Sequence, residues 1–299
     1  RFYLLFSPLG FGSTFERKPL IQRAVEGSSE YSLGVGEELK DRVFEALRLS
    51  VEGFLANERN QLDPKNDLRR CQEHSLVFLY RLLFIMYAED RGLLPYRTNH
   101  TYTKNRSLAR HRDDVATLLD QVYGGFRGTD YSLGECSIWE DLQDLFDLID
   151  RGHGRYGVQA YNGGLCDLDA DTFLAENQIP DWYMARVLDQ LGRAPQPDRP
   201  ELGLFRVDYR DLAIQQLGSV YEGLLELHPQ YAQSDMRVVR AKRQSSKHEL
   251  VLPDNFEVPR GYEATSISYK AGSIYLATDK GERRRTGSYY TPDHIASRH

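Results

Sequence analysis

The sequence has few cysteines and no apolar run long enough to cross a membrane. Cys71, Cys136 and Cys166 lie far apart and form no CxxC pair. So sparse a set excludes a disulfide-stapled secreted domain and favours a reducing, cytoplasmic location. The longest apolar run, residues 75–88, is interrupted by Arg81 and is too short for a membrane span, which needs roughly 20 residues. We therefore expect no contact with a membrane and interpret this run as a buried helix.

A secretion signal is also missing, and the first residue is arginine rather than methionine. The apolar opening RFYLLFSPLGF is typical of structured interior. We therefore expect the chain to be a segment of a longer polypeptide. Hydrophobic residues make up 40% of it and charged residues 27%, which excludes disorder of the whole chain.

Negative charge dominates, but unevenly. The net charge is −6; from Arg237 onward, however, 12 basic residues stand against 7 acidic ones. The residues before Arg237 hold 26 basic and 37 acidic side chains. An acidic body followed by a basic tail indicates that any contact with a polyanion lies in the tail. Ordinary fluctuation of charge along a chain is the alternative explanation.

The first 230 residues favour helices. Leu39, Val43, Leu47, Val51 and Leu55 recur at every fourth position, which is the period of an amphipathic helix. The same reasoning predicts helices over residues 36–56, Ser75–Asp90, Ser137–Asp150, Pro180–Leu191 and Asp211–Leu227. The segments Gly92–Arg106 and Gly152–Asp171 are rich in Gly, Asn, Tyr and Asp, and we expect long loops there.

After about residue 231 the pattern changes to short β-like segments. Residues Thr265–Tyr269 and Ser273–Thr278 alternate between polar and apolar side chains and flank a turn at Lys270–Gly272. Met236–Ala241 and Glu249–Leu252 are also β-like. The expected fold is therefore mainly α, with a small antiparallel β element near the C-terminus.

The most informative string is Arg283–Pro292, RRRTGSYYTP. Gly287 permits backbone shapes that other residues resist, Thr291 can cap a helix, and Pro292 suits the first helical turn. The N-terminus of such a helix offers unpaired N–H groups and a partial positive charge, which can receive a carboxylate. A tyrosine-containing turn that only starts a helix is the plainer alternative.

This string resembles the motif that opens the methyltransferase domain of gamma-class adenine-N6 DNA methyltransferases, in large restriction–modification (type IIG-like) or phage-defence enzymes. Three other segments resemble the helical region upstream of that domain, and they occur in the family's order. They are Leu79–Pro95, the Asn-Gly-Gly-Leu loop within Tyr161–Phe173, and Leu217–Leu227. Cys166 stands where an aromatic residue is expected, and the resemblance is weakest over residues 1–70.

The resemblance implies a domain order and a cofactor. Residues 1–230 would form a helical connector, residues 231–282 a small β-rich linker, and residues 283–299 the start of a truncated α/β methyltransferase domain. S-adenosylmethionine is the implied cofactor, and the implied cofactor-binding residues are Gly287, Ser288, Tyr289, Tyr290, Thr291 and Pro292.

The implied partners are double-stranded DNA and the upstream and downstream domains of the same polypeptide. Phosphate contacts are expected from Arg283, Arg284, Arg285, Lys242 and Arg243, with a solvated basic linker as the alternative. The family's glycine-rich cofactor loop and catalytic Asn-Pro-Pro-Tyr are absent from the sequence, as is a nuclease pattern. We therefore assign no catalytic residues, and we expect the segment alone neither to methylate nor to cut DNA.

Two other constellations have structural explanations. Glu89-Asp90-Arg91 closes a very apolar helix, and we expect it to cap a helix and form an internal ion pair rather than act in catalysis. Cys71 and His74 have a CxxH spacing, but no second ligand pair lies nearby in the sequence, so we assign no metal site. A stand-alone helical interaction module without a cofactor is the alternative to the connector hypothesis.

Overall fold

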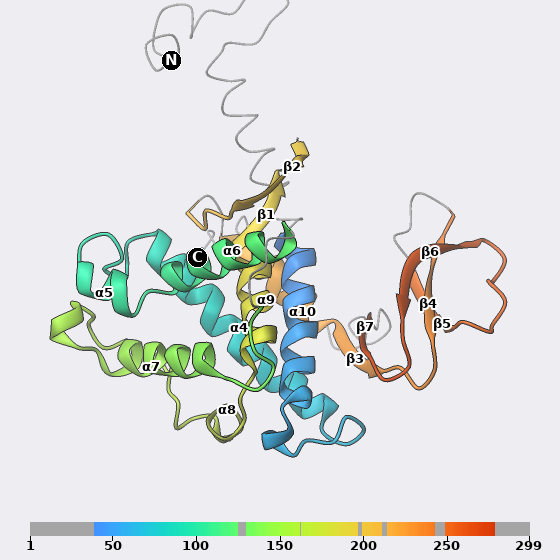
Figure 1. Cartoon of the computed structure of the whole chain (residues 1–299), viewed down its shortest axis with the longest axis horizontal. Helices are drawn as coiled ribbons and strands as arrows, with labels where there is room; N and C mark the ends of the chain where they lie inside the picture. Colours follow the sequence, from blue (N-terminus) through green and yellow to red (C-terminus); the bar gives the residue numbers. More distant parts are fainter. Residues whose placement is uncertain are drawn as a thin grey trace, which may run out of the picture.

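The computed structural model describes residues 39–124, 130–161, 163–196, 199–210, 214–242 and 249–278. Helices form the body, and a few small antiparallel strands follow toward the C-terminus, as the sequence predicts (Figure 1). The helices comprise one over residues 39–56, η1 (Glu58–Asn60), α4 (Leu68–Asp90), α5 (His100–Asn105), α6 (Leu108–Tyr123), α7 (Ser137–Arg151), η2 (Gly154–Tyr156), α8 (Thr172–Glu176), α9 (Asp181–Gly192) and α10 (Ile214–Leu225).

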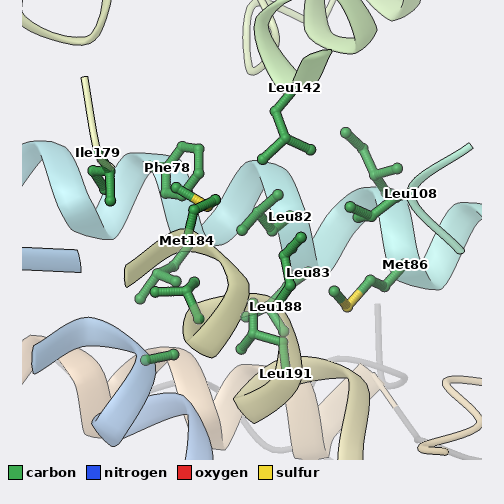
Figure 2. Close-up of a cluster of buried hydrophobic side chains, with 14 of the residues drawn as sticks. Phe78, Leu82, Leu83, Met86, Leu108, Leu142, Ile179, Met184, Leu188 and Leu191 are labelled. Atoms are coloured by element: carbon green, nitrogen blue, oxygen red, sulfur yellow. The ribbon is translucent and has the colours of Figure 1, made fainter. Parts of the chain in front are cut away.

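Helix α4 lies at the centre of the body. It carries apolar side chains on most of its sides, so other helices can pack against it from several directions. Figure 2 shows Phe78, Leu82, Leu83 and Met86 of α4 among side chains of three other helices. Those neighbours are Leu108 of α6, Leu142 of α7, and Met184, Leu188 and Leu191 of α9. None of the described helices has the combination of length and apolar character that a membrane span requires.

Buried carboxylates on one helix cap the N-terminus of another. Glu89, fully buried at the end of α4, accepts hydrogen bonds of 2.8 Å from the backbone N–H groups of Leu108 and Ala109 in the first turn of α6. Asp181, at the start of α9, accepts one of 2.8 Å from the N–H of Ile138 in the first turn of α7. The first N–H groups of a helix have no partner within it, so these contacts fix the helices relative to one another.

Long-range contacts also satisfy the C-terminal carbonyls of α9. The Arg42 guanidinium donates to the carbonyls of Asp189 and Gln190, both at 3.1 Å, and the Tyr209 hydroxyl donates to that of Leu191 at 2.8 Å. These partners come from the helix over residues 39–56 and from the segment that follows residue 206. The end of α9 is therefore held by residues far from it in sequence.

The helical part contains two helices that were not predicted from the sequence. The apolar pattern does not predict α6: its buried face has the helical period, but His111 and Arg112 occupy two of the positions where apolar residues would mark it. The expected long loop Gly92–Arg106 contains α5, whose first turn is capped by Asn99, the Oδ1 of which accepts from the N–H of Tyr102. In both segments, polar side chains occupy positions at which apolar residues would show the helical period. The sequence pattern therefore does not predict these helices.

The expectation of helices alone before residue 230 is wrong at two places. Strands β1 (Arg193–Gln196) and β2 (Arg199–Arg206) pair antiparallel between α9 and α10. Strand β3 (Leu227–Tyr231) begins at Leu227, which the sequence pattern predicts to be the last residue of the helix Asp211–Leu227. That helix, α10, ends at Leu225, and residues 211–213 lie outside the described part. Proline within these segments argues against strands, but a two-stranded sheet has only edge strands, which tolerate it.

The remaining strands form a bent antiparallel arm, drawn in orange and red in Figure 1. The outgoing chain forms β3 and then β4 (Met236–Ala241), and the returning chain forms β6 (Tyr262–Tyr269) and then β7 (Ile274–Thr278). Strand β4 pairs with β6, and β3 pairs with β7, while β5 (Glu249–Pro253) joins the free side of β4. The turn expected at Lys270–Gly272 is therefore the bend of this arm and not a hairpin that pairs β6 with β7.

The bend is held by several contacts. The side chain of Asp235 accepts from Lys270 Nζ at 2.8 Å and from the N–H of Ala271 at 2.9 Å. The N–H of Gly272 donates to the carbonyl of Ala232 at 2.8 Å, and Gly272 has φ +90°, a region that favours glycine. The rings of Tyr269 and Tyr275 stack across the bend at 5.3 Å. The two halves of the arm are thus joined by specific contacts.

Candidate functional site

Most of the site residues predicted from the sequence lie outside the described part of the chain. This holds for the cofactor motif Gly287–Pro292, for Arg283–Arg285 and for Arg243. Lys242 is described: it follows β4, is exposed, and its backbone N–H donates to the carbonyl of Gly261 at 2.9 Å. The described residues show instead how the chain approaches the motif.

The approach runs along the ribbon formed by β3 and β7, which lies against the helical body. Thr278, at the end of β7, is registered opposite Leu227, the first residue of β3. The side-chain amide of Gln72 in α4 donates to the carbonyl of Leu227, and Ile274 in β7 is 3% exposed. The returning chain therefore comes back to the body close to the point where it left.

The basic residues near the bend of the arm are compensated by neighbouring acceptors. Arg237 Nε lies 3.3 Å from the Asp254 carboxylate, and its Nη2 donates to the carbonyl of Phe256 at 3.0 Å. Lys270 is paired with Asp235 at 2.8 Å. From Arg237 onward, the described residues contain five basic and four acidic side chains. Most of the basic excess of the tail therefore belongs to residues outside the described part.

The cluster at the end of α4 has the structural role that the sequence indicated. Glu89 also accepts a hydrogen bond of 2.8 Å from the Tyr102 hydroxyl. Its carboxylate therefore accepts hydrogen bonds from three donors, this hydroxyl and two backbone N–H groups. Burial raises the pKa of Glu89, and these hydrogen bonds oppose the rise. The carboxylate thus caps α6 and ties it to α5, which confirms the helix-capping interpretation.

Asp90 fixes the segment after β2 to the same end of α4. Its carboxylate accepts from Arg206 Nη2 at 3.2 Å and from the N–H of Tyr209 at 3.1 Å. Arg112 Nη2 lies 3.7 Å from Asp90, and its buried guanidinium has no hydrogen-bond acceptor among the described residues. The expected internal ion pair is therefore present, and Asp90 provides a negative charge beside a buried cation.

The loop Gly152–Asp171 packs on α4 through a buried arginine. Arg81, 1% exposed, donates from Nη2 to the carbonyl of Asp167 at 2.9 Å and lies over the Phe146 ring at 5.4 Å. Cys166, which replaces the expected aromatic residue, is buried, and burial raises the pKa of its thiol to about 11. A thiol with so high a pKa stays protonated at neutral pH, so Cys166 behaves as a small apolar residue.

Cys71 and His74 face different neighbours. Cys71 is fully buried, and burial raises the pKa of its thiol to about 12. His74 Nδ1 lies 2.8 Å from Asp171 Oδ2, and its ring stacks on Phe173 at 4.4 Å. Within the described ranges, no group of three or more His, Cys, Asp or Glu side chains is placed to hold a metal ion.

His111 gives this region a testable pH dependence. Burial lowers the pKa of His111, and Arg110 adds to the effect, while Asp141 and Asp114 oppose it. The unfolded histidine binds a proton near its usual pKa of about 6.5, but the folded one does so only at lower pH. The unfolded state therefore binds more protons in this window, and the free energy of unfolding should fall as the pH drops from about 7 toward about 5.5.

Replacing His111 by Gln should make this decrease smaller, as measured by urea unfolding at closely spaced pH values. His100→Gln is the matched control, because it removes an exposed histidine from α5. An unchanged pH slope in the His111 variant would show that other groups cause the decrease.

No family model matches the chain, and neither the curated proteins nor the solved structures contain a match to it.

Proposed function

We propose that this chain is the helical connector of a site-specific DNA adenine-N6 methyltransferase of a restriction–modification or phage-defence system. The observation that carries the proposal is the string Arg283–Pro292, which follows the β arm in the sequence. Leu79–Pro95, Tyr161–Phe173 and Leu217–Leu227 add support, because they resemble the upstream region of that family in the same order. In this role the chain positions neighbouring domains on DNA and supplies the first cofactor-binding motif.

The ribbon of β3 and β7 is compatible with such a connector. Thr278 is paired with Leu227 at the edge of the body, and Gly287 follows Thr278 by nine residues in the sequence. A chain of nine residues spans at most about 30 Å, so the motif must begin within that distance of the end of β7. A connector that holds β7 against its helices therefore limits where the methyltransferase domain can sit.

In the intact enzyme, the N-terminus of the helix opened by Thr291 and Pro292 would receive the carboxylate of S-adenosylmethionine. Tyr289 and Tyr290 would pack against apolar parts of the cofactor or a neighbouring strand. The cofactor supplies the methyl group, which goes to the amino group of a flipped adenine. The residues that contact the adenine belong to the family's Asn-Pro-Pro-Tyr motif, which the sequence does not contain.

Calorimetry with S-adenosylmethionine tests the proposal, on this chain and on a chain extended through the downstream coding sequence. We expect binding by the extended chain and its loss, by about 100-fold or more, when Thr291 and Pro292 are both changed to Ala. Thr117→Ala, at an exposed position of α6, is the control and should bind normally.

Absence of binding by both chains would overturn the methyltransferase proposal. It would favour the second hypothesis, a stand-alone helical module that binds protein partners and uses no cofactor. Binding by the extended chain that does not depend on Thr291 and Pro292 would overturn the role of the motif.

A further inference from the structure

The arm separates its charges along its length. Near the bend, Arg237 and Lys270 are paired with Asp254 and Asp235. At the far end, which we call the arm tip and define as Arg240, Lys242, Glu249, Arg260 and Glu263, three basic residues stand against two acidic ones. Arg240 is registered opposite Glu249 in β5 and opposite Glu263 in β6, whereas Lys242 and Arg260 lie just beyond the paired strands.

Lys242 and Arg260 are far apart in the sequence and are brought together by the fold. The N–H of Lys242 donates to the carbonyl of Gly261 at 2.9 Å, so the residue after Arg260 contacts the backbone of Lys242. Gly261 has φ +88°, which favours glycine at this turn. Both side chains are exposed, and no described residue forms an ion pair with either. Residues 243–248 lie outside the described part and are not included in the site.

The arm also carries this charge away from the acidic body. In Figure 1 the sheet of β4, β5 and β6 stands to one side of the helices and is joined to them through β3 and β7. At physiological ionic strength, charges are screened over about 8 Å. Charges of the helical body that lie farther than this from the tip are therefore largely screened there, although the whole chain carries a net charge of −6.

We propose that the arm tip contacts the phosphate backbone of double-stranded DNA through Lys242 and Arg260. This inference rests on the proposed function, which makes duplex DNA the partner, and it adds Arg260 and the arm to the contacts expected from the sequence. Exposed cations on a projecting element suit phosphates, which need charge but no shaped pocket. Such contacts position the protein and carry no sequence information.

Fluorescence anisotropy with labelled duplexes of two unrelated sequences tests this inference on the full chain, without S-adenosylmethionine. The double variant Lys242→Ala, Arg260→Ala should bind both duplexes about tenfold more weakly at low salt. Its plot of log affinity against log salt concentration should be shallower by about 2, since each lost phosphate contact contributes about 0.9. The charge-preserving variant Lys242→Arg, Arg260→Lys should retain binding.

The matched control is Arg97→Ala, Lys104→Ala, which removes two exposed cations at or near α5, on the opposite side of the body from the arm (Figure 1). Equal weakening in this control, or an unchanged salt slope in the tip variant, would overturn the inference. Tip-dependent binding to poly-glutamate but not to duplex would overturn it in favour of an acidic protein partner. If the extended chain binds S-adenosylmethionine but DNA binding does not depend on the tip, only the arm inference is overturned. If DNA binding depends on the tip but neither chain binds S-adenosylmethionine, only the methyltransferase proposal is overturned.

Discussion

Glu89→Ala is expected to lower the free energy of unfolding by about 3–5 kcal/mol. The variant leaves the N–H groups of Leu108 and Ala109 and the hydroxyl of Tyr102 without their acceptor in a fully buried site. It also removes a negative charge that lies near the buried Arg112. Each unsatisfied buried donor costs about 1–3 kcal/mol, so the loss of three exceeds the effect of an ordinary substitution.

Urea unfolding followed by circular dichroism measures this effect. Glu89→Gln should cost less, about 1–3 kcal/mol, because its amide oxygen still accepts while its NH₂ group faces donors. Glu176→Ala, at an exposed position in α8, is the control and should change stability by no more than about 0.5 kcal/mol. A loss below about 1 kcal/mol for Glu89→Ala would contradict the capping role assigned to this carboxylate.

Phe78→Ala is expected to have a comparable effect, about 3–5 kcal/mol, for a different reason. Phe78 is fully buried in α4, stacks on Trp139 at 4.8 Å and meets Phe146 edge-on at 6.0 Å. Trp139 in turn contacts Phe54 at 5.5 Å, so this ring joins α4 and α7 to the helix over residues 39–56. Removal of the Phe78 ring, which Figure 2 shows within the buried cluster, leaves a cavity and breaks the contact between α4 and Trp139 of α7.

The same unfolding measurement, with tryptophan emission as a second signal, distinguishes packing from a general effect of losing an aromatic ring. Phe78→Leu should cost about 1 kcal/mol, because it fills most of the space. Phe256→Ala, 59% exposed in the arm, should be nearly neutral. Equal stability of the Phe78→Ala and Phe256→Ala variants would show that the body does not depend on this aromatic contact.

The sequence alone was sufficient where a helix buries one apolar face. The helices predicted over residues 36–56, Ser75–Asp90, Ser137–Asp150 and Pro180–Leu191 all occur, although α4 begins at Leu68 and not at Ser75, and residues 36–38 lie outside the described part. Helical period and apolar side chains are local properties, so they can be recognised without knowledge of the neighbours. The string Arg283–Pro292 is likewise a property of the sequence, and the functional proposal depends on it.

Tertiary structure decided the features that depend on distant partners. α6 is stabilised with His111 and Arg112 on its buried face, because Glu89 caps its start and Asp90 lies beside Arg112. Among the described strands, β7 pairs with β3 and not with β6, a choice between partners that strand period does not specify. The backbone of Lys242 contacts Gly261, the residue after Arg260, only because β4 and β6 pair. Hydrogen-bond partners and strand neighbours are set by the packing of the whole chain, and local residue patterns do not contain that information.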